Sequence, residues 1–228
     1  MIKSEHEILS ISKAVEIGDQ CFSYILGFIE IGMSEKEVAA EIERFLYENG
    51  AESLAFETIC VSGSRGCLPH GEPSDKLIEK GDFLTMDFGA VVDGYCGDMT
   101  RTIAIGSISA EQRKVYDIVL EAQLAAIDFI KAGINCADAD KVARDIIIKA
   151  GYGDDYPHGL GHGVGKLVHE APTLNSKSTE ILESNMVITI EPGIYIPNKF
   201  GVRIEDLAIV TDFGIINKVK SSKELIIL

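Results

Sequence analysis

The sequence predicts an α/β (α+β) fold in which two related halves, each running helix, helix and strand pair, meet at a shared central sheet. Three observations lead to this prediction. Helical periodicity precedes strand-like segments twice along the chain, short motifs recur after 101 to 104 residues, and the strand-like segments of both halves carry carboxylates among apolar neighbours. With 228 residues, 46% hydrophobic and 25% charged, the chain is long enough to bury a sizeable core.

Two helices open the first half. Apolar residues across Ile8–Ile29 recur at spacings of three, four and seven, which predicts a long helix that ends at Gly32. A second helix is expected to begin at Ser34, because Ser34 and Glu37 have the spacing of a capping box. The Asn-Gly pair ending at Gly50 is a good stop signal for this helix.

Three strand-like segments complete the first half, at Ser53–Ser62, Phe83–Val92 and Tyr95–Ile105. Asp93-Gly94 separates the last two and is a strong signal for a two-residue hairpin turn.

The second half repeats this order. Helices are predicted over about Ala110–Lys131 and Ala137–Lys149, a stretch rich in Gly and His follows at 157–169, and strands are predicted at Met186–Ile196 and Val202–Thr211. Phe28 recurs as Phe129 after 101 residues, and the acidic position Asp87 recurs as Glu191 after 104. These offsets indicate a duplicated unit, with halves at about 5–107 and 110–212.

The acidic strand pairs are the first candidates for a functional site. With Asp93-Gly94 as the turn, the numbers of cross-strand partners sum to 187, so that Asp87 faces Thr100 and Asp98 lies diagonally on the same face. Two carboxylates this close in an apolar setting repel each other unless one is protonated or a cation lies between them. Glu191 and Glu205 have a similar arrangement in the second half.

Histidines add to these carboxylates. His6 is interpreted as a surface residue, whereas the other four histidines lie in segments flanked by Gly or Pro, where the backbone can approach a ligand closely. These four are His70, His158, His162 and His169. Four carboxylates with one imidazole form a mostly hard ligand set, which suits Mn, Co, Fe or Zn in a two-metal site better than a structural zinc site.

Charge and composition exclude several other classes. A net charge of −15 argues against binding to nucleic acid. No apolar run is long enough to span a membrane, and the N-terminus lacks a secretory signal. The five cysteines are odd in number and form no C-x-x-C pair, so we expect reduced thiols and a cytoplasmic location.

Taken together, the motifs resemble the methionine aminopeptidase and X-Pro peptidase superfamily. The resemblance implies the pita-bread (creatinase/aminopeptidase) fold, with two pseudo-symmetric helix-helix-strand halves around a central curved antiparallel sheet. The Ser62–Gly66 run before His70 and the short spacing from Glu191 to Glu205 are similar to the X-Pro branch, aminopeptidase P or prolidase. The matching motifs are Leu68–Gly71, Met86–Ala90, Gly97–Thr102, His158–Gly163, His169–Pro172, Ile190–Tyr195 and Val202–Asp206.

The resemblance also implies the roles of site residues. Asp87 would hold one divalent metal ion, His162 and Glu191 the other, and Asp98 and Glu205 both. A water that bridges the metals would attack the scissile carbonyl, with Glu191 as proton shuttle. The remaining roles are substrate orientation and hydrogen bonding by His70 and His169, support of the Gly-rich segment by His158, and for Arg203 either a substrate carboxylate or a ligand carboxylate as partner.

The expected substrates are therefore short peptides with proline at the second position. Thr173 follows Pro172, where such prolidases often carry a basic residue, so dipeptidase and aminopeptidase activity both stay open. A methionine aminopeptidase would share the site, and a non-catalytic peptide- or protein-binding member of the fold is the alternative of another class. X-Pro enzymes usually carry an N-terminal domain, and we expect residues 1–228 to be one catalytic domain without it. The native metal, the preferred first residue and the oligomeric state, including a homodimer, are left open.

Overall fold

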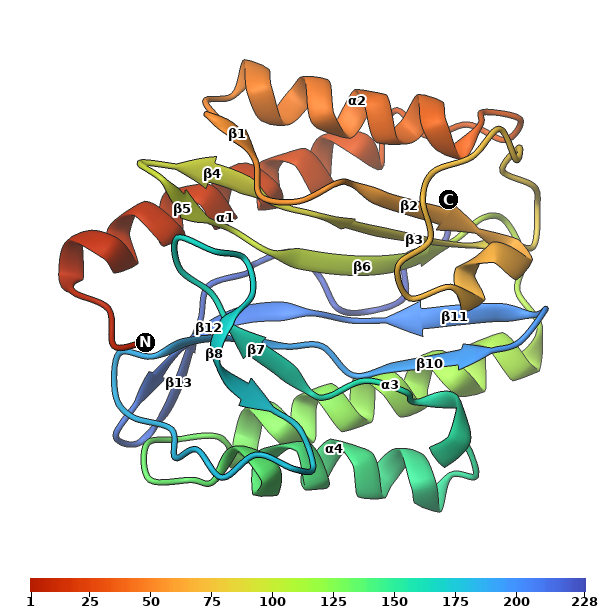
Figure 1. Cartoon of the computed structure of the whole chain (residues 1–228). Helices are drawn as coiled ribbons and strands as arrows, with labels where there is room; N and C mark the ends of the chain where they lie inside the picture. The colour runs from red at the N-terminus through yellow and green to blue at the C-terminus, as the bar shows by residue number, and fades with distance from the viewer.

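Two pairs of α-helices enclose the strands in the computed structural model, which describes residues 1–228 (Figure 1). The first pair, α1 (Glu5–Ile25) and α2 (Glu35–Glu48), lies on one side of the strands. The second pair, α3 (Ala110–Phe129) and α4 (Cys136–Lys149), lies on the opposite side. The molecule is thus layered as helices, strands and helices, as predicted for two halves that share their strand layer.

Side-chain caps begin each of these helices. The predicted capping box at Ser34 is confirmed, since its hydroxyl accepts from the Glu37 N–H and the Glu37 carboxylate accepts from the Ser34 N–H. The predicted end of the first helix, at Gly32, was wrong by about two turns. After Ile25 the backbone N–H groups of Gly27 and Phe28 bond to carbonyls three residues back, which tightens the chain into a turn before the helical pattern of apolar residues ends.

The strands of the first half form two small antiparallel sheets. The first sheet contains β2 (Ile59–Ser62), β3 (Phe83–Phe88) and β6 (Met99–Ala104) in the order β2-β3-β6. The second contains β1 (Ser53–Leu54), β4 (Ala90–Val92) and β5 (Tyr95–Cys96) in the order β1-β4-β5. The predicted hairpin register is confirmed, because Asp87 pairs with Thr100 and Val92 with Tyr95.

Each long strand predicted in the first half is divided in two. The predicted Phe83–Val92 strand breaks at Gly89, where a side chain would lie 2.0 Å from the carbonyl oxygen of Gly97. This close approach folds the outer part of the hairpin away from β3 and β6, and it leaves Asp98 at the bend. The predicted Ser53–Ser62 strand is likewise interrupted, between Leu54 and Ile59.

The second half has a five-stranded sheet in the order β13-β12-β9-β7-β8 and a hairpin of β10 and β11. These strands are β7 (Gly161–Gly163), β8 (Glu170–Leu174), β9 (Val187–Ile190), β10 (Gly193–Ile196), β11 (Phe200–Arg203), β12 (Asp206–Thr211) and β13 (Gly214–Asn217). The strand predicted at Met186–Ile196 is divided at Glu191, and that at Val202–Thr211 is divided at Glu205. The Glu191 N–H bonds to Leu160 and the Glu205 N–H bonds across to Thr100 of the first half, so both acidic residues lie where the strands change partners.

The two halves share the same internal contacts. In the first half the Gly32 N–H bonds to the carbonyl of Ile78, and in the second the Gly133 N–H bonds to the carbonyl of Leu182. Both glycines have positive φ, at 95° and 88°, a conformation that few residues other than glycine adopt. The recurrence of this contact confirms the predicted pseudo-symmetric halves.

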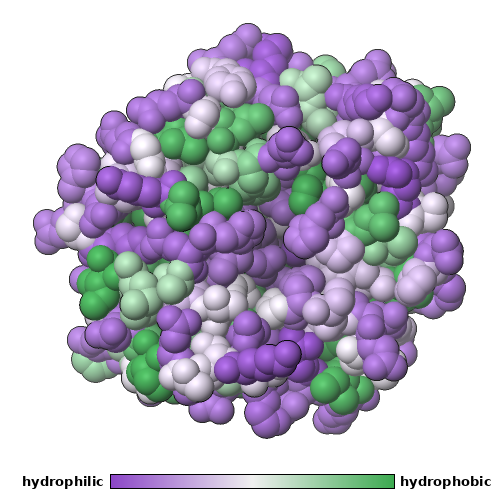
Figure 2. Space-filling model, viewed as in Figure 1, coloured by the Kyte–Doolittle hydropathy of each residue, from purple (hydrophilic) through white to green (hydrophobic).

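Each half also has its own hydrophobic core. One cluster of buried side chains lies mainly beneath α1 and α2, and a second lies mainly beneath α3 and α4. The face seen in Figure 2 is mostly hydrophilic and is hollowed near its centre, in the region between the two helix pairs. None of the helices combines the length and the hydropathy needed to cross a lipid bilayer.

Candidate active site

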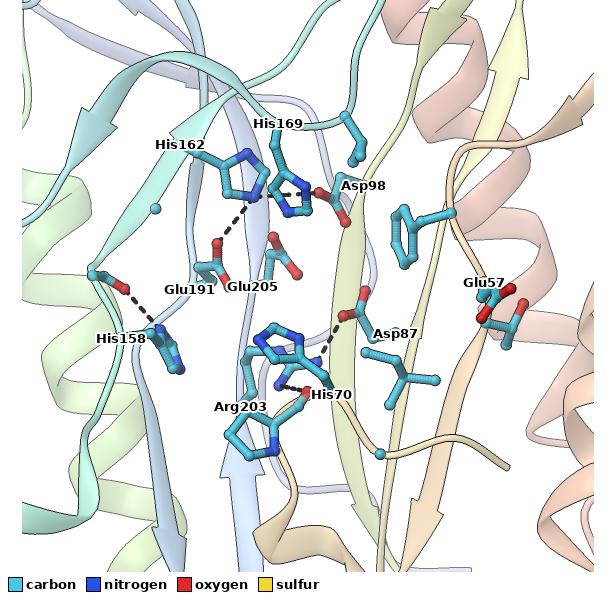
Figure 3. Close-up of a pocket in the computed structure, with 18 of the residues that line it drawn as sticks. Glu57, His70, Asp87, Asp98, His158, His162, His169, Glu191, Arg203 and Glu205 are labelled. Atoms are coloured by element: carbon cyan, nitrogen blue, oxygen red, sulfur yellow. Dashed lines mark hydrogen bonds and ion pairs between the residues drawn. The ribbon is translucent and has the colours of Figure 1, made fainter. Parts of the chain in front are cut away.

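A cavity of about 720 Å³ opens between the two halves and is lined by residues of both. All nine residues that the sequence singled out line this cavity (Figure 3), although they come from segments up to 135 residues apart. They are His70, Asp87, Asp98, His158, His162, His169, Glu191, Arg203 and Glu205. The structure therefore brings together every predicted site residue, and the remaining question is how each is oriented.

Three of these residues form a compact cluster of ligand atoms. One ligand atom each from Asp98, His162 and Glu205 lies within 4.8 Å of the others. His162 Nε2 lies 3.8 Å from Asp98 Oδ2 and 3.2 Å from Glu191 Oε1, so Glu191 adjoins the same cluster. Asp98 belongs to the first half and the others to the second, which places the cluster at the junction of the halves.

Asp87 lies on the other side of the site and is held by Arg203. Arg203 Nη2 donates to Asp87 Oδ2 over 2.7 Å, and both side chains are largely buried. The second oxygen, Asp87 Oδ1, is buried without a hydrogen-bond partner. Of the two kinds of partner expected for Arg203, the structure shows a carboxylate of the site, Asp87. A buried, unpartnered carboxylate oxygen is unusual in a folded protein, and it is a fitting ligand for a cation.

Burial makes the charged forms of these carboxylates costly. Burial, together with the charge of Glu205, raises the pKa of Asp98 well above its usual value. Burial, together with the charge of Glu191, has the same effect on the pKa of Glu205. Divalent cations bound between these groups would offset both the cost of burying their charges and the repulsion between them. Carboxylates with one imidazole are also ligands that such ions prefer. The residues present therefore fit a divalent metal centre.

His162 and Glu191 each favour the charged form of the other. Burial opposes the charge on His162, but its hydrogen bond to Glu191 outweighs this and raises the pKa of the imidazole. Burial likewise opposes the charge on Glu191, yet the bond to His162 lowers the pKa of that carboxyl. The two side chains stabilise each other in the charged state.

The other histidines differ in how freely they face the cavity. His158 Nδ1 lies 2.8 Å from the carbonyl oxygen of Gly159, and Nε2 lies 2.9 Å from the hydroxyl of Tyr195, so both ring nitrogens have protein partners. His169 and His70 are exposed at the cavity, and the ring of His169 lies 4.3 Å from that of His162 in an edge-on arrangement. His70 and His169 are thus the imidazoles that a substrate can reach.

Three hydroxyl residues to which the sequence assigned no role support the charged groups. The Thr100 hydroxyl donates to Glu205 Oε2 over 2.6 Å, and the Thr189 hydroxyl donates to Glu191 Oε1 over 3.0 Å. Tyr195 accepts from Arg203 Nη1 over 2.8 Å and contacts His158. Sequence position could have indicated both threonines. Each lies two residues from Asp98 or Glu191, a spacing that places both side chains on the same face of an extended strand.

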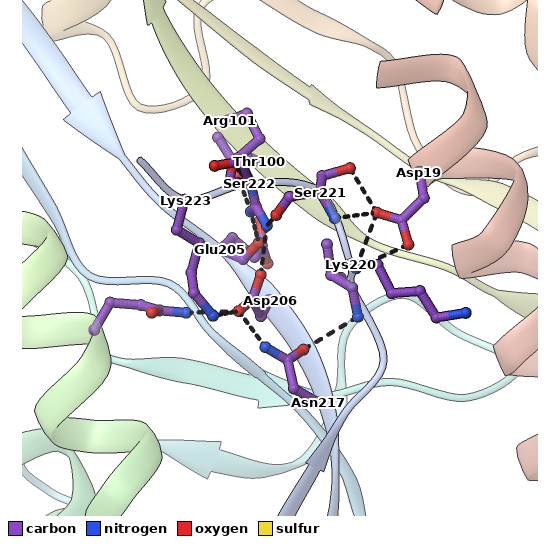
Figure 4. A network of polar contacts seen from close by, with 12 residues as sticks. Asp19, Thr100, Arg101, Glu205, Asp206, Asn217, Lys220, Ser221, Ser222 and Lys223 are labelled. Atoms are coloured by element: carbon purple, nitrogen blue, oxygen red, sulfur yellow. Dashed lines mark hydrogen bonds and ion pairs between the residues drawn. The ribbon is translucent and has the colours of Figure 1, made fainter. Parts of the chain in front are cut away.

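The backbone of Glu205 is fixed by a buried polar network (Figure 4). Arg101 Nη1 donates to the backbone carbonyls of Thr100 and Glu205 over 2.9 and 2.5 Å. Arg101 Nη2 donates to Asp206 Oδ1 over 2.7 Å, while Asp206 Oδ2 accepts from Gln123, Asn217 and Lys223. The network joins β6, β12 and the C-terminal segment directly behind the cluster of ligand atoms.

Comparison with known proteins identifies the family. The family model described as metallopeptidase family M24 matches residues 10–212. The chain belongs to metallopeptidase family M24. Among its M24 relatives, an Xaa-Pro dipeptidase of Pyrococcus furiosus is 47% identical over 226 residues, covering 99% of this chain and 65% of the relative.

Solved M24 structures share the fold closely. An Xaa-Pro dipeptidase from Bacillus anthracis superimposes with a TM-score of 0.98 at 51% identity, covering 100% of this chain and 64% of the other. An X-Pro aminopeptidase from Thermotoga maritima MSB8 gives a TM-score of 0.98 at 42% identity, covering 100% and 65%. The predicted fold is therefore confirmed. The chain spans about two thirds of the length of these M24 proteins.

Proposed function

We propose that this M24 chain is a metallo-exopeptidase that hydrolyses short peptides at X-Pro bonds with two divalent metal ions. The observation that carries the proposal is the convergence of Asp98, His162 and Glu205, from both halves, around one space within the cavity. Relatives that match the whole chain and are named Xaa-Pro dipeptidase or X-Pro aminopeptidase support the same bond preference.

Asp87 would hold one ion, His162 and Glu191 the other, and Asp98 and Glu205 both, with Mn, Co, Zn and Fe as candidates. When bound, such ions polarise the scissile carbonyl and increase the acidity of the attacking water. The unpartnered Asp87 Oδ1 is one argument for a ligand at that position. The other argument is that buried carboxylates outnumber buried cationic side chains in the cavity.

Glu191 is the proposed proton carrier. Its Oε1 accepts from the Thr189 hydroxyl over 3.0 Å, and the side chain lines the cavity. A carboxylate fixed in this way can accept the proton that the water loses and deliver it to the leaving proline nitrogen. The proline nitrogen must gain this proton as the bond breaks, because an amide anion is a very poor leaving group.

His70 and His169 are proposed to orient the peptide and donate hydrogen bonds as charge develops on the carbonyl oxygen. Both are exposed at the cavity, with His169 beside His162 and His70 near Arg203 and Asp87 (Figure 3). His158 and Arg203 instead support the site, since their polar atoms are engaged by Tyr195 and Asp87. This assigns Arg203 to positioning Asp87 and leaves it unavailable for a substrate carboxylate.

The direct test is an assay of the metal-loaded protein on Ala-Pro, Ala-Pro-Ala and Met-Ala peptides. We expect cleavage of the two prolyl peptides and not of Met-Ala. The ratio of the cleavage rates of Ala-Pro and Ala-Pro-Ala separates dipeptidase from aminopeptidase activity. Preferred cleavage of Met-Ala would favour a methionine aminopeptidase. Binding of peptides without cleavage of any would favour the non-catalytic alternative and overturn the proposal.

The ligand assignment predicts the effect of removing a carboxylate shared by both ions. Asp98→Ala and Glu205→Ala are each expected to lower kcat by at least about a thousandfold, because one shared ligand supports both ions. Far-UV circular dichroism should stay unchanged. Asp75→Ala, at an exposed carboxylate outside the cavity, is the control and should keep wild-type turnover. Persisting X-Pro cleavage in either ligand variant would contradict the assignment.

A further inference from the structure

The segment between β2 and β3 carries part of the cavity wall with little regular structure of its own. It contains one short 3₁₀ helix, Gly63–Cys67, followed by turns and extended backbone as far as β3. Pro69, His70, Gly71, Glu72 and Pro73 of this segment line the cavity. Since no strand ladder holds these residues, some other contact must fix the place of His70.

That contact is made by Glu35, the first residue of α2, which is fully buried at 0% exposure. Its Oε1 accepts from the N–H and the hydroxyl of Ser62, at 2.7 and 3.0 Å. Its Oε2 accepts from the N–H and the hydroxyl of Ser74, at 3.0 and 2.7 Å, and from Arg65 Nε at 2.9 Å. One carboxylate thus holds both ends of the segment 62–74, and His70 lies between these ends.

Two further contacts close the segment on itself and on the site. Arg65, held by Glu35, donates through Nη2 to the carbonyl oxygen of Glu72 over 2.6 Å. The carbonyl oxygen of Pro69 accepts from Arg203 Nη1 over 3.1 Å, and Arg203 in turn holds Asp87. The path from Glu35 to the cavity therefore passes through direct hydrogen bonds at each step.

The second half shows that the fold does not need a carboxylate at this place. Cys136 is the first residue of α4, as Glu35 is of α2, and it is equally buried. The Cys136 N–H bonds to Glu180 just as the Glu35 N–H bonds to Lys76. The start of α4 is thus well packed with a small thiol in place of a carboxylate. The Glu35 carboxylate must therefore serve a feature that only the first half has, and the feature that it contacts is the segment that carries His70.

We propose that Glu35 is a positioning residue for X-Pro hydrolysis, which holds the segment 62–74 so that His70 faces the substrate. The proposal rests on the proposed function, because it concerns the role of His70. Glu35→Gln tests it. An amide presents one oxygen and one NH2 group, so it cannot accept from Ser62 on one side and from Ser74 and Arg65 on the other. On one side the amide NH2 group then faces backbone and side-chain donors, and the hydrogen bonds on that side are lost.

The experiment is a double-mutant cycle between Glu35→Gln and His70→Ala in the metal-loaded protein, measured on Ala-Pro and Ala-Pro-Ala. Glu35→Gln alone is expected to lower kcat/KM about tenfold or more at unchanged metal content. In the His70→Ala background it should lower kcat/KM less than twofold, because the group that it positions is absent. Glu48→Gln, an exposed carboxylate on the same helix, is the control and should behave as wild type.

Hydrogen–deuterium exchange supplies a readout without activity. Amides within 63–74 should exchange faster in Glu35→Gln than in wild type, while those of α4 stay unchanged. If Glu35→Gln does not fold, Ser74→Ala removes one of the same hydrogen bonds and should produce smaller changes in the same direction.

Two results overturn the proposal: wild-type kcat/KM in Glu35→Gln, or an equal loss in both His70 backgrounds. Failure of the proposed function is a separate outcome, since wild-type protein would then cleave no X-Pro peptide. In that event faster exchange in 63–74 would still support the positioning contact, and unchanged exchange would contradict it.

Discussion

Single hydrogen bonds orient the carboxylates that we propose as metal ligands. Thr100 is fully buried, and its hydroxyl donates to Glu205 and accepts from Arg203 Nε over 3.0 Å. One threonine therefore links Glu205 to the arginine that holds Asp87. A partner of this kind orients a metal ligand without contacting the metal itself.

Thr100→Val keeps the shape of this side chain and removes the link. We expect metal affinity to fall by about ten- to a hundredfold, because Glu205 is freed to turn away from the shared space. Isothermal titration with Mn²⁺ measures this. Thr85→Val is the matched control, since the buried Thr85 hydroxyl bonds only to Thr102, and it should bind Mn²⁺ as wild type does. Equal affinity in Thr100→Val and wild type would contradict the role given to Thr100.

Arg203 illustrates that the sequence can identify a site residue without identifying its partner. Eight of the nine candidate residues were found because carboxylate or histidine side chains in apolar or Gly-rich surroundings are conspicuous, and Arg203 was added by the family resemblance. The partner of Arg203 was left between two choices, because Asp87 lies 116 residues away in the other half. Glu35 was not singled out from the sequence, since nothing local reveals that its carboxylate is buried against Ser62 and Ser74.

At the scale of elements, the C-terminal segment is held by the buried Arg101–Asp206 pair, with side-chain exposures of 1% and 0%. Arg101 also donates to the carbonyls of Ser221 and Ser222, and Asp19 on α1 accepts from the N–H groups of Lys220 and Ser221 (Figure 4). Strand β6, strand β12, helix α1 and the last residues of the chain are thus joined behind the site.

Breaking this pair from one side should be far more costly than breaking a surface pair. Arg101→Met leaves Asp206 buried without its main partner, and we expect it to lower the free energy of unfolding by about 3–5 kcal/mol. Lys36→Met removes the exposed pair with Asp75 and should cost less than about 1 kcal/mol. Urea denaturation of both variants measures the difference. Similar losses in the two variants would show that the buried network does not fix the C-terminal segment.

Element order and register were predictable for a local reason, and the strand breaks were not. The Asp93-Gly94 turn sets the pairing of its flanking strands, so the partner of Asp87 followed from counting. The breaks at Gly89, Glu191 and Glu205 depend on contacts with Gly97, Leu160 and Thr100, which lie on or next to other strands. Apolar residues continue through these breaks, so the hydrophobic pattern alone reads as one long strand.

At the scale of the whole molecule, the duplication explains where the site lies. Each half folds around its own core, and each contributes acidic residues at the places where its strands change partners. Asp98 from one half and Glu205 from the other meet there, with the Glu205 N–H bonded to Thr100 across the junction. A cavity built in this way gathers more negative charge than its own cationic side chains neutralise.

The central claim is that this charge serves to bind two divalent ions, and metal stoichiometry tests it most directly. The protein would be stripped with chelator, equilibrated with Mn²⁺ or Co²⁺, freed of excess ion and measured by inductively coupled plasma mass spectrometry. The account predicts two ions per chain in wild type, and fewer than one in Glu205→Ala. A wild-type chain that retains no ion at saturating metal, or a Glu205→Ala chain that still retains two, would contradict it.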